Sequence, residues 1–334
     1  MSLKNFGVQP DGTPSRATTR LRQMLSSGTM VAAPFVLNAF HAKIAEQVGF
    51  QALYMTGFGT AAERGYPDVG LVTQTEMVEN ARYIASAVDV PVFCDADTGY
   101  GNPINVTRTI REYERAGVAG CHIEDQVFPK KCGFFEGKLV IPMEEHVQKI
   151  RAALAARRDP DFVVIARTDA YGAVGGSMEE AIWRGRAYAD AGVDLVWCEL
   201  SNSDRAPAIE FARAMRQTHP KLPLAFNYSS SFRWHKDPDP LTFRELGELG
   251  YKFIFITLYG AHAAMYSVWN AMHELVKNEE QAQWALERTK VGHPTESHHV
   301  MARVAHFQEL ERRYIPGTDD RLRGSDGFSE ATAH

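Results

Sequence analysis

Three observations predict that this chain folds as a (β/α)8 TIM-type barrel. Eight short apolar runs alternate with helical patterns between about residue 30 and residue 275. Each run is nearly continuous in apolar character, which is typical of a parallel strand buried on both faces. The length of 334 residues suits one such barrel. A doubly wound sheet is the alternative, but LNAFHAK, the turn after the first run, lacks the expected GxGxxG pattern.

The elements follow one another regularly along the chain. The apolar runs cover 30–37, 52–56, 90–97, 120–125, 161–168, 194–199, 222–227 and 252–257, and helical spacing is clearest at 74–88, 105–118 and 177–193. Three helical segments end at Gly117, Gly192 and Gly250, where a left-handed cap favours glycine. We therefore expect one barrel domain over 1–334, with extra C-terminal helices at 278–313 and a polar tail at 314–334.

The composition is that of an ordinary soluble globular protein. A formal net charge of −5 gives no reason to expect nucleic acid or an anionic membrane as partner. Because the chain has no apolar run of about 18 residues and its first residues lack a signal-peptide pattern, we expect a cytoplasmic protein. The four cysteines show no CxxC spacing, so neither a zinc knuckle nor a disulfide framework is predicted.

Carboxylates collect where two neighbouring strands end. Asp95 and Asp97 close the third run and Glu124 closes the fourth, and catalytic residues of such barrels lie at these strand ends. The i, i+2 spacing puts both aspartates on one face of a strand. A hard cation such as Mg²⁺, held by one or two carboxylates and several waters, would relieve their repulsion. The alternative is that these acids cap helices or pair with Arg167. His122 is interpreted as a buried strand histidine, and zinc is not expected.

The remaining strand ends carry groups that suit carboxylate ligands. Arg167 lies at the end of the fifth run and offers a bidentate fork. Neutral donors follow the seventh and eighth runs and could bind a second carboxylate without adding charge; they are Asn227, Ser229, Ser231 and Thr257. The serine-rich turn is equally well explained as a loop with local backbone hydrogen bonds.

Cys132 lies in the loop KKCGFFEGK, residues 130–138, a few positions after the fourth run. The lysines at 130 and 131 are expected to favour its thiolate. No histidine stands near it in the sequence, so acid–base work is favoured over acyl transfer. The alternative is a small buried residue in a loop.

Several stretches together resemble the isocitrate lyase/phosphoenolpyruvate mutase superfamily, and the resemblance extends along essentially the whole chain. They are YPD at 66–68, DADTGYG at 95–101, HIEDQ, KKCG followed by GKLVIP, IARTDA, DLVWCE, FNYSSSFRW and GYKFIFITL. Each falls at the expected strand end and in the expected order. The motifs are closest to isocitrate lyase, whereas the compact length is that of methylisocitrate lyase.

The resemblance implies a Mg²⁺-dependent lyase, with Mn²⁺ as an alternative cation. Such an enzyme cleaves isocitrate, an alkyl-isocitrate or a related substituted malate into glyoxylate or pyruvate and a succinate-like acid. It also implies a barrel that exchanges its last helix with a partner, usually in homotetramers. The implied partner is therefore a small di- or tricarboxylate substrate.

The resemblance also implies roles for particular residues. Asp95, Asp97 and Glu124 would hold the metal, and Glu199 would order its water shell. Thr56, Gly57 and Arg167 would grip the 2-oxo acid, with Phe58 and Asp68 beside the substrate. Asn227, Ser229, Ser231 and Thr257 would bind the succinate-like half. Cys132 would protonate the departing carbanion.

Three positions depart from the family pattern. Phe134 stands where the family lyases have histidine after Lys-Lys/Arg-Cys-Gly. Phe58 stands where isocitrate lyases tend to carry tryptophan and methylisocitrate lyases glycine, and Thr56 replaces a serine. The alternatives are an oxaloacetate hydrolase or decarboxylase, a phosphonate-type member of the superfamily, or a carboxylate-binding homologue without catalysis.

Overall fold

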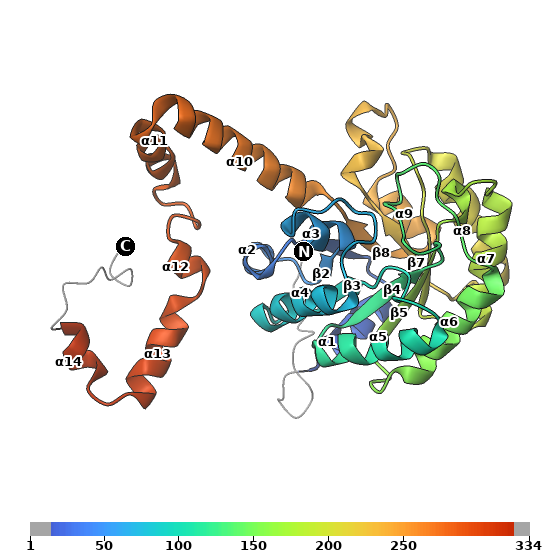
Figure 1. Ribbon diagram of the computed structural model, residues 1–334, viewed down its shortest axis with the longest axis horizontal. Coiled ribbons are helices and arrows are strands. Elements are labelled where there is room, and N and C mark those ends of the chain that lie inside the picture. Colours follow the sequence, from blue (N-terminus) through green and yellow to red (C-terminus); the bar gives the residue numbers. More distant parts are fainter. Residues whose placement is uncertain (1–14, 324–334) are drawn as a thin grey trace. The chain divides into compact units, whose positions relative to one another are not determined.

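The structure, a computed structural model, describes residues 15–323 and contains one sheet of eight parallel strands (Figure 1). The strands are β1 Val31–Pro34, β2 Leu53–Met55, β3 Val92–Asp95, β4 Gly120–Glu124, β5 Val163–Thr168, β6 Leu195–Cys198, β7 Leu224–Asn227 and β8 Tyr251–Ile256. Their order is β1-β8-β7-β6-β5-β4-β3-β2, so consecutive strands from β2 to β8 are neighbours in the sheet, and β1 pairs with β8. All eight apolar runs predicted as strands form strands.

The sheet curves until its two edges meet. β1 and β2 approach one another through a single parallel bridge between Phe35 and Tyr54. The amide of Val36 also donates to the carbonyl oxygen of Tyr54 at 2.9 Å. This nearly closed ring with intervening helices confirms the predicted (β/α)8 barrel.

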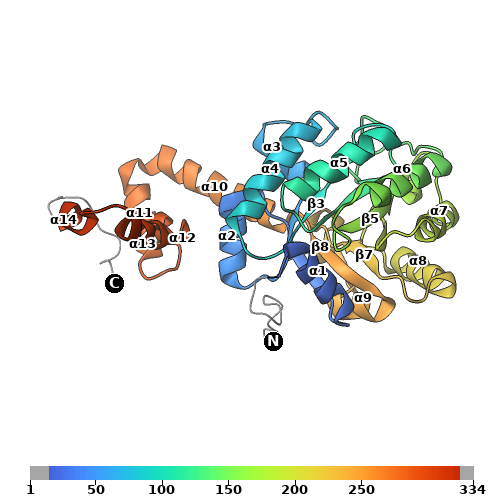
Figure 2. The same cartoon turned by 90° about the horizontal axis from the view of Figure 1, so that it is seen from below.

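Helices connect the strands and lie outside them (Figures 1 and 2). In the barrel they are α1 Ala17–Ser26, α2 Ala39–Val48, α3 Gly57–Glu63, α4 Gln74–Ala87, α5 Pro103–Arg115, α6 Met143–Ala156, α7 Met178–Asp190, α8 Arg205–Thr218 and α9 Phe243–Leu249, with 3-10 turns η1 Ala170–Gly172, η2 Ser230–Phe232 and η3 Trp234–Lys236. The predicted caps are present, since Gly117, Gly192 and Gly250 have φ values of 82°, 95° and 105°. At these angles a side chain would strain the backbone.

The interior of the barrel is filled by large aromatic side chains. Tyr54, Phe93, Trp197, Phe253 and Phe255 belong to one buried cluster and are each at most 2% exposed. Such close packing leaves no channel through the barrel. The polar residues at the strand ends therefore lie above a tightly packed apolar core.

The described chain divides into two compact units between His262 and Ala263. Helix α10, Tyr259–Asn278, begins just before this point, and α11 Glu280–Lys290, α12 His298–Met301, α13 Val304–Tyr314 and α14 Thr318–Arg323 follow. The helical stretch at 297–314 is broken at Arg303, whose φ of 61° is left-handed. The predicted tail, 314–334, begins at the last residue of α13 and includes α14, while residues 324–334 lie outside the described residues.

Helix exchange, the homotetramer and the assignment of 1–334 to a single domain stay predictions. Within residues 15–323, no helix combines the length and the apolar character needed to cross a membrane.

Candidate active site

A cavity of about 380 Å³ lies at the carboxyl ends of the strands. It is lined by all predicted site residues except Gly57, Asp97 and Glu124. A larger cavity of about 770 Å³ lies near the opposite strand ends, beside Leu195 and Leu224, and holds none of those residues. We place the site in the smaller cavity because the thiol, the arginine and the hydroxyl donors converge there.

The acidic side of the site is organised by a turn at the end of β3. Asp95 accepts hydrogen bonds from the amides of Gly57 at 2.9 Å and Asp97 at 2.8 Å. The strand ends at Asp95, and Asp97 adopts a left-handed φ of 44°, so the argument from one strand face is wrong for Asp97. The turn still brings the carboxylates together, because an oxygen of each lies 3.0 Å from where a Cβ of Gly57 would stand.

Burial makes two of the three acids, Asp97 and Glu124, harder to ionise. Burial, together with the charges of Asp95 and Asp68, raises the pKa of Asp97 to about 7 although Lys130 opposes the change. Burial also raises the pKa of Glu124 well above its ordinary value, with Arg167 opposing. Crowded, buried carboxylates of this kind are the groups that a divalent cation would stabilise in their charged form.

The donor atoms fit a cation that keeps most of its waters. Glu124 Oε1 is buried without a hydrogen-bond partner, while its Oε2 lies 3.4 Å from Arg167 Nη1. Lys130 Nζ lies 3.0 Å from Asp97 Oδ1. Within residues 15–323, no three His, Cys, Asp or Glu side chains gather closely enough to hold one ion. Arg167 and Lys130 pair with two of the predicted ligands, and Mg²⁺ needs only one or two carboxylates, so the assignment of Asp95, Asp97 and Glu124 as metal ligands stays a prediction.

Arg167 is held by Asp169 rather than left free. Its Nε and Nη2 donate to the two oxygens of Asp169 at 2.8 and 2.9 Å, and its guanidinium lies 4.6 Å from the Trp197 ring centre. The fork predicted for a substrate carboxylate is thus occupied on its bidentate side. Arg167 still lines the cavity with its remaining edge, and the nearby charge of Asp169 keeps its pKa raised despite burial.

The neutral donors gather on the opposite wall. Thr257 Oγ1 donates to Asn227 Oδ1 at 2.5 Å, and Asn227 Nδ2 donates to Glu199 Oε1 at 3.1 Å. Ser229 Oγ accepts from the amide of Ser231 at 3.1 Å, so the local-backbone explanation holds for that oxygen. The hydroxyl hydrogens of the serines stay available to a ligand in the cavity.

Cys132 lines the cavity from the loop after β4. Its amide donates to the carbonyl oxygen of Asp68 at 3.0 Å. Burial, followed by the charge of Asp68, raises the pKa of the Cys132 thiol to about 11, although Lys130 opposes the change. Lys130 favours the thiolate, as expected, but burial and the charge of Asp68 outweigh it, so the expected lowering of the thiol pKa is wrong. Cys132 is therefore a protonated thiol at neutral pH.

The Phe134 side chain packs against an aromatic residue of η2. Its ring packs edge-on against Phe232 at 5.1 Å between centroids, and it lines the cavity together with Phe135. Phe134, which stands where the family pattern has histidine, therefore forms an apolar part of the cavity wall.

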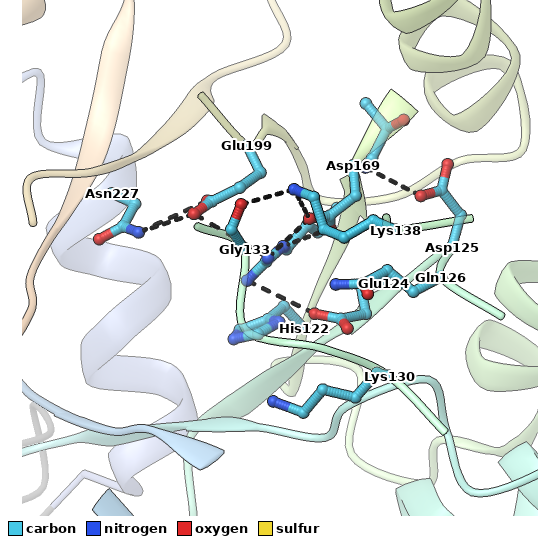
Figure 3. Close-up of polar contacts among 12 residues, drawn as sticks. His122, Glu124, Asp125, Gln126, Lys130, Gly133, Lys138, Asp169, Glu199 and Asn227 are labelled. Atoms are coloured by element: carbon cyan, nitrogen blue, oxygen red, sulfur yellow. Dashed lines mark hydrogen bonds and ion pairs between the residues drawn. The ribbon is translucent and has the colours of Figure 1, made fainter. Parts of the chain in front are cut away.

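Sequence reasoning missed residues that hold this site together. Lys138 and Asp169 join the loop to Arg167, and Figure 3 shows them beside Gly133 and Glu199. An acid two residues after Arg167 was a visible signal for Asp169. Trp197 was also detectable, because it stands two residues before Glu199 and alternate residues of a strand share a face. Nothing local in the sequence points to Lys138.

Comparison with known proteins agrees with these motifs. Residues 21–276 match the phosphoenolpyruvate phosphomutase family. The chain is 48% identical over 314 residues to an isocitrate lyase of Haloferax volcanii, covering 94% of this chain and 91% of that protein. It is 43% identical over 257 residues to a 2,3-dimethylmalate lyase of Eubacterium barkeri, covering 76% and 85%.

Solved structures share the fold over nearly the whole chain. A phosphoenolpyruvate phosphomutase from Streptomyces platensis subsp. rosaceus has a TM-score of 0.80 and 33% identity, covering 89% of this chain and 99% of that one. A phosphonopyruvate hydrolase in complex with oxalate and Mg²⁺ has a TM-score of 0.77 and 29% identity, covering 90% and 100%. The protein therefore belongs to the isocitrate lyase/phosphoenolpyruvate mutase superfamily.

Proposed function

We propose that the protein is a Mg²⁺-dependent carbon–carbon lyase acting on isocitrate, an alkyl-isocitrate or a related substituted malate. One observation carries the proposal: the cavity sets the protonated thiol of Cys132 among the donors Asn227, Ser229, Ser231 and Thr257. A proton donor beside a neutral carboxylate cradle suits a reaction that leaves a carbanion next to a carboxylate.

The reaction is a retro-aldol cleavage. The substrate hydroxyl loses its proton, and the bond between the carbinol carbon and the neighbouring carbon breaks. The carbinol carbon becomes the carbonyl of a 2-oxo acid, and the electron pair stays on the carbon beside the other carboxylate. The Cys132 thiol gives that carbon a proton. Glu199 lines the cavity, and burial raises its pKa, which suits a group that accepts the hydroxyl proton.

Asp95, Asp97 and Glu124 are the residues that would hold the cation. When bound, Mg²⁺ would supply positive charge to the oxygens of the 2-oxo acid half. Arg167 would add a fixed positive charge on the same side, while Thr56 and Phe58 would border that half. The relatives named isocitrate lyase and 2,3-dimethylmalate lyase support cleavage of this kind.

A panel of acids tests the proposal. The purified protein with Mg²⁺ is incubated separately with isocitrate, 2-methylisocitrate and 2,3-dimethylmalate, and released glyoxylate or pyruvate is measured. We expect at least one acid to be cleaved, and Cys132→Ser to lower kcat by about 10²-fold or more, the usual contribution of a positioned acid. If no acid of the panel is cleaved, the lyase proposal fails.

A second candidate is hydrolysis or decarboxylation of oxaloacetate, or chemistry on a phosphonate. The fold shared with phosphonopyruvate hydrolase favours it. Such substrates have no need of the donors at the carboxyl ends of β7 and β8. If Ser229→Ala and Ser231→Ala leave turnover of oxaloacetate or phosphonopyruvate intact, and no malate derivative is cleaved, this candidate replaces the first.

A third candidate is a carboxylate-binding protein without catalysis, because Phe134 replaces an imidazole with a ring that cannot hydrogen-bond. Calorimetry that detects binding of an acid from the panel, while no product forms with Mg²⁺ present, would support it.

A further inference from the structure

Lys138 is the last residue of the Cys132 loop, residues 130–138, and has no part in the proposed reaction. Its side chain is 2% exposed, which is unusual for a lysine. Its Nζ donates to the carbonyl oxygen of Gly133 at 2.6 Å and to Asp169 Oδ1 at 3.0 Å (Figure 3). A buried ammonium retains its charge only with such partners. Lys138 therefore spans from the residue after Cys132 to the barrel wall.

Asp169 is the shared acceptor for the loop and the arginine. The Oδ1 that receives Lys138 also receives Arg167 Nη2 at 2.9 Å, and Oδ2 receives Arg167 Nε at 2.8 Å. Asp169 is itself fixed, because its amide donates to Asp125 Oδ1 at 2.9 Å and Asp125 accepts from Tyr188 at 2.6 Å. The position of Asp169 thus sets both the loop and Arg167.

Gly133 is where the loop touches the site. A Cβ built on Gly133 would lie 2.5 Å from Glu199 Oε1 and 2.8 Å from Arg167 Nη2. The backbone therefore lies directly against both side chains, and Lys138 holds its carbonyl from the other side. Since Cys132 is the preceding residue, any movement of the Gly133 peptide changes where the thiol stands.

We propose that Lys138 is a positioning residue that couples the Cys132 loop to Arg167 through Asp169. The proposal rests on the proposed lyase function for its kinetic consequence but not for its structural one. Without the ammonium, the Gly133 carbonyl loses its donor, and Arg167 is left to neutralise Asp169 alone. The loop then leaves the cavity more often, and the thiol spends less time at the reacting carbon.

Lys131 provides a matched control on the same loop. Its Nζ also donates to loop carbonyls, those of Glu136 at 3.5 Å and Gly137 at 3.0 Å. Lys131 is exposed, whereas Lys138 is buried and paired with Asp169. A general effect of removing a lysine from this loop would appear in both variants, whereas the proposed coupling would appear only at Lys138.

The test compares Lys138→Ala and Lys131→Ala with the unchanged chain in two measurements. The first is kcat and KM on the best acid of the panel. The second is the rate at which iodoacetamide alkylates Cys132 in the free protein, followed by mass spectrometry of its peptide. For Lys138→Ala we expect kcat to fall by about 10²-fold, the effect of roughly 1 Å of misplacement, and alkylation to become several-fold faster. Lys131→Ala should match the unchanged chain in both.

Rescue separates positioning from general damage. Alanine at 138 leaves a space shaped like the lost alkylammonium chain, so propylammonium should restore part of kcat and slow alkylation again. If Lys138→Ala does not fold, Lys138→Met replaces it. The test then depends on kcat and on the alkylation rate of Cys132, without rescue.

Unchanged alkylation and kcat in the Lys138 variant would overturn the proposal, as would equal effects at Lys131 or a loss that propylammonium fails to restore. If the unchanged chain cleaves no acid, the proposed function fails, while the alkylation rates still decide the coupling.

Discussion

The reactivity of Cys132 gives the sharpest test of the site, because the structure predicts the opposite of what the neighbouring lysines suggest. Burial raises the pKa of its thiol from the ordinary value of 9.0 to about 11. At pH 8 an ordinary thiol of that pKa is about one-tenth thiolate, whereas Cys132 would be about one-thousandth thiolate. Because alkylation requires the thiolate, Cys132 should react about a hundredfold more slowly than an unperturbed cysteine.

The assay follows alkylation of the Cys132 peptide by iodoacetamide between pH 7 and pH 10, in the native protein and in urea. In urea the rate should level off above pH 9. In the native protein it should keep rising about tenfold per pH unit across this range, because the pKa lies above it. The slope separates a raised pKa from poor access, since poor access alone would lower the rate equally at every pH.

The sign of the shift also fixes the functional consequence. A thiol whose pKa is raised remains protonated as the pH passes 9 and loses its proton only near 11. Cleavage, which needs the proton, should therefore show no decline from Cys132 near pH 9. Asp68→Asn removes the neighbouring charge that raises this pKa most and should speed alkylation. A native profile that levels off near pH 9 would refute the argument.

Other predictions concern single parts of the site. Gly133→Ala, whose Cβ would lie 2.5 Å from Glu199 Oε1, should lower kcat by about 10²-fold, whereas Gly247→Ala, with open space around it, should not. Tyr188→Phe leaves a buried carboxylate short of one donor and should lower the free energy of unfolding in urea by about 1–3 kcal/mol, and an unchanged midpoint would contradict this. Mg²⁺ at a hundred times its dissociation constant should raise the free energy of unfolding by about 2.7 kcal/mol, measured by thermal unfolding. EDTA should reverse this stabilisation, and Asp97→Asn should remove it.

Much of the fold was predictable because its signals are local. Each strand is a short apolar run, and a polar residue such as Glu124 or Asn227 follows directly where the run ends. In a parallel barrel these ends meet on one face, so strand order alone gathers most of the site. The glycine caps, as at Gly192, are equally local.

The charge state of the site was not predictable, because it depends on partners far apart in the sequence. Lys130 lies two residues from Cys132, yet its ammonium is engaged by Asp68, 62 positions away. Lys130 still favours the thiolate, but burial of the thiol and the charge of Asp68 outweigh that effect. Asp97 differs for another reason: its left-handed backbone angle ends the strand geometry on which the spacing argument relied.

The attachment of Arg167 and Lys138 to one carboxylate also determines how the cavity can respond to ligands. Flexible long side chains commonly lose about 0.5–1.5 kcal/mol of rotational freedom each when a ligand orders them. Asp169 already orders the side chains of Lys138 and Arg167 in the folded protein. A substrate acid of the right size therefore binds with a smaller loss of side-chain entropy. The same rigidity prevents the wall from moving aside for a longer acid. The site should therefore discriminate between acids by the length of their carbon chain, and adding one methylene to a good substrate should weaken binding.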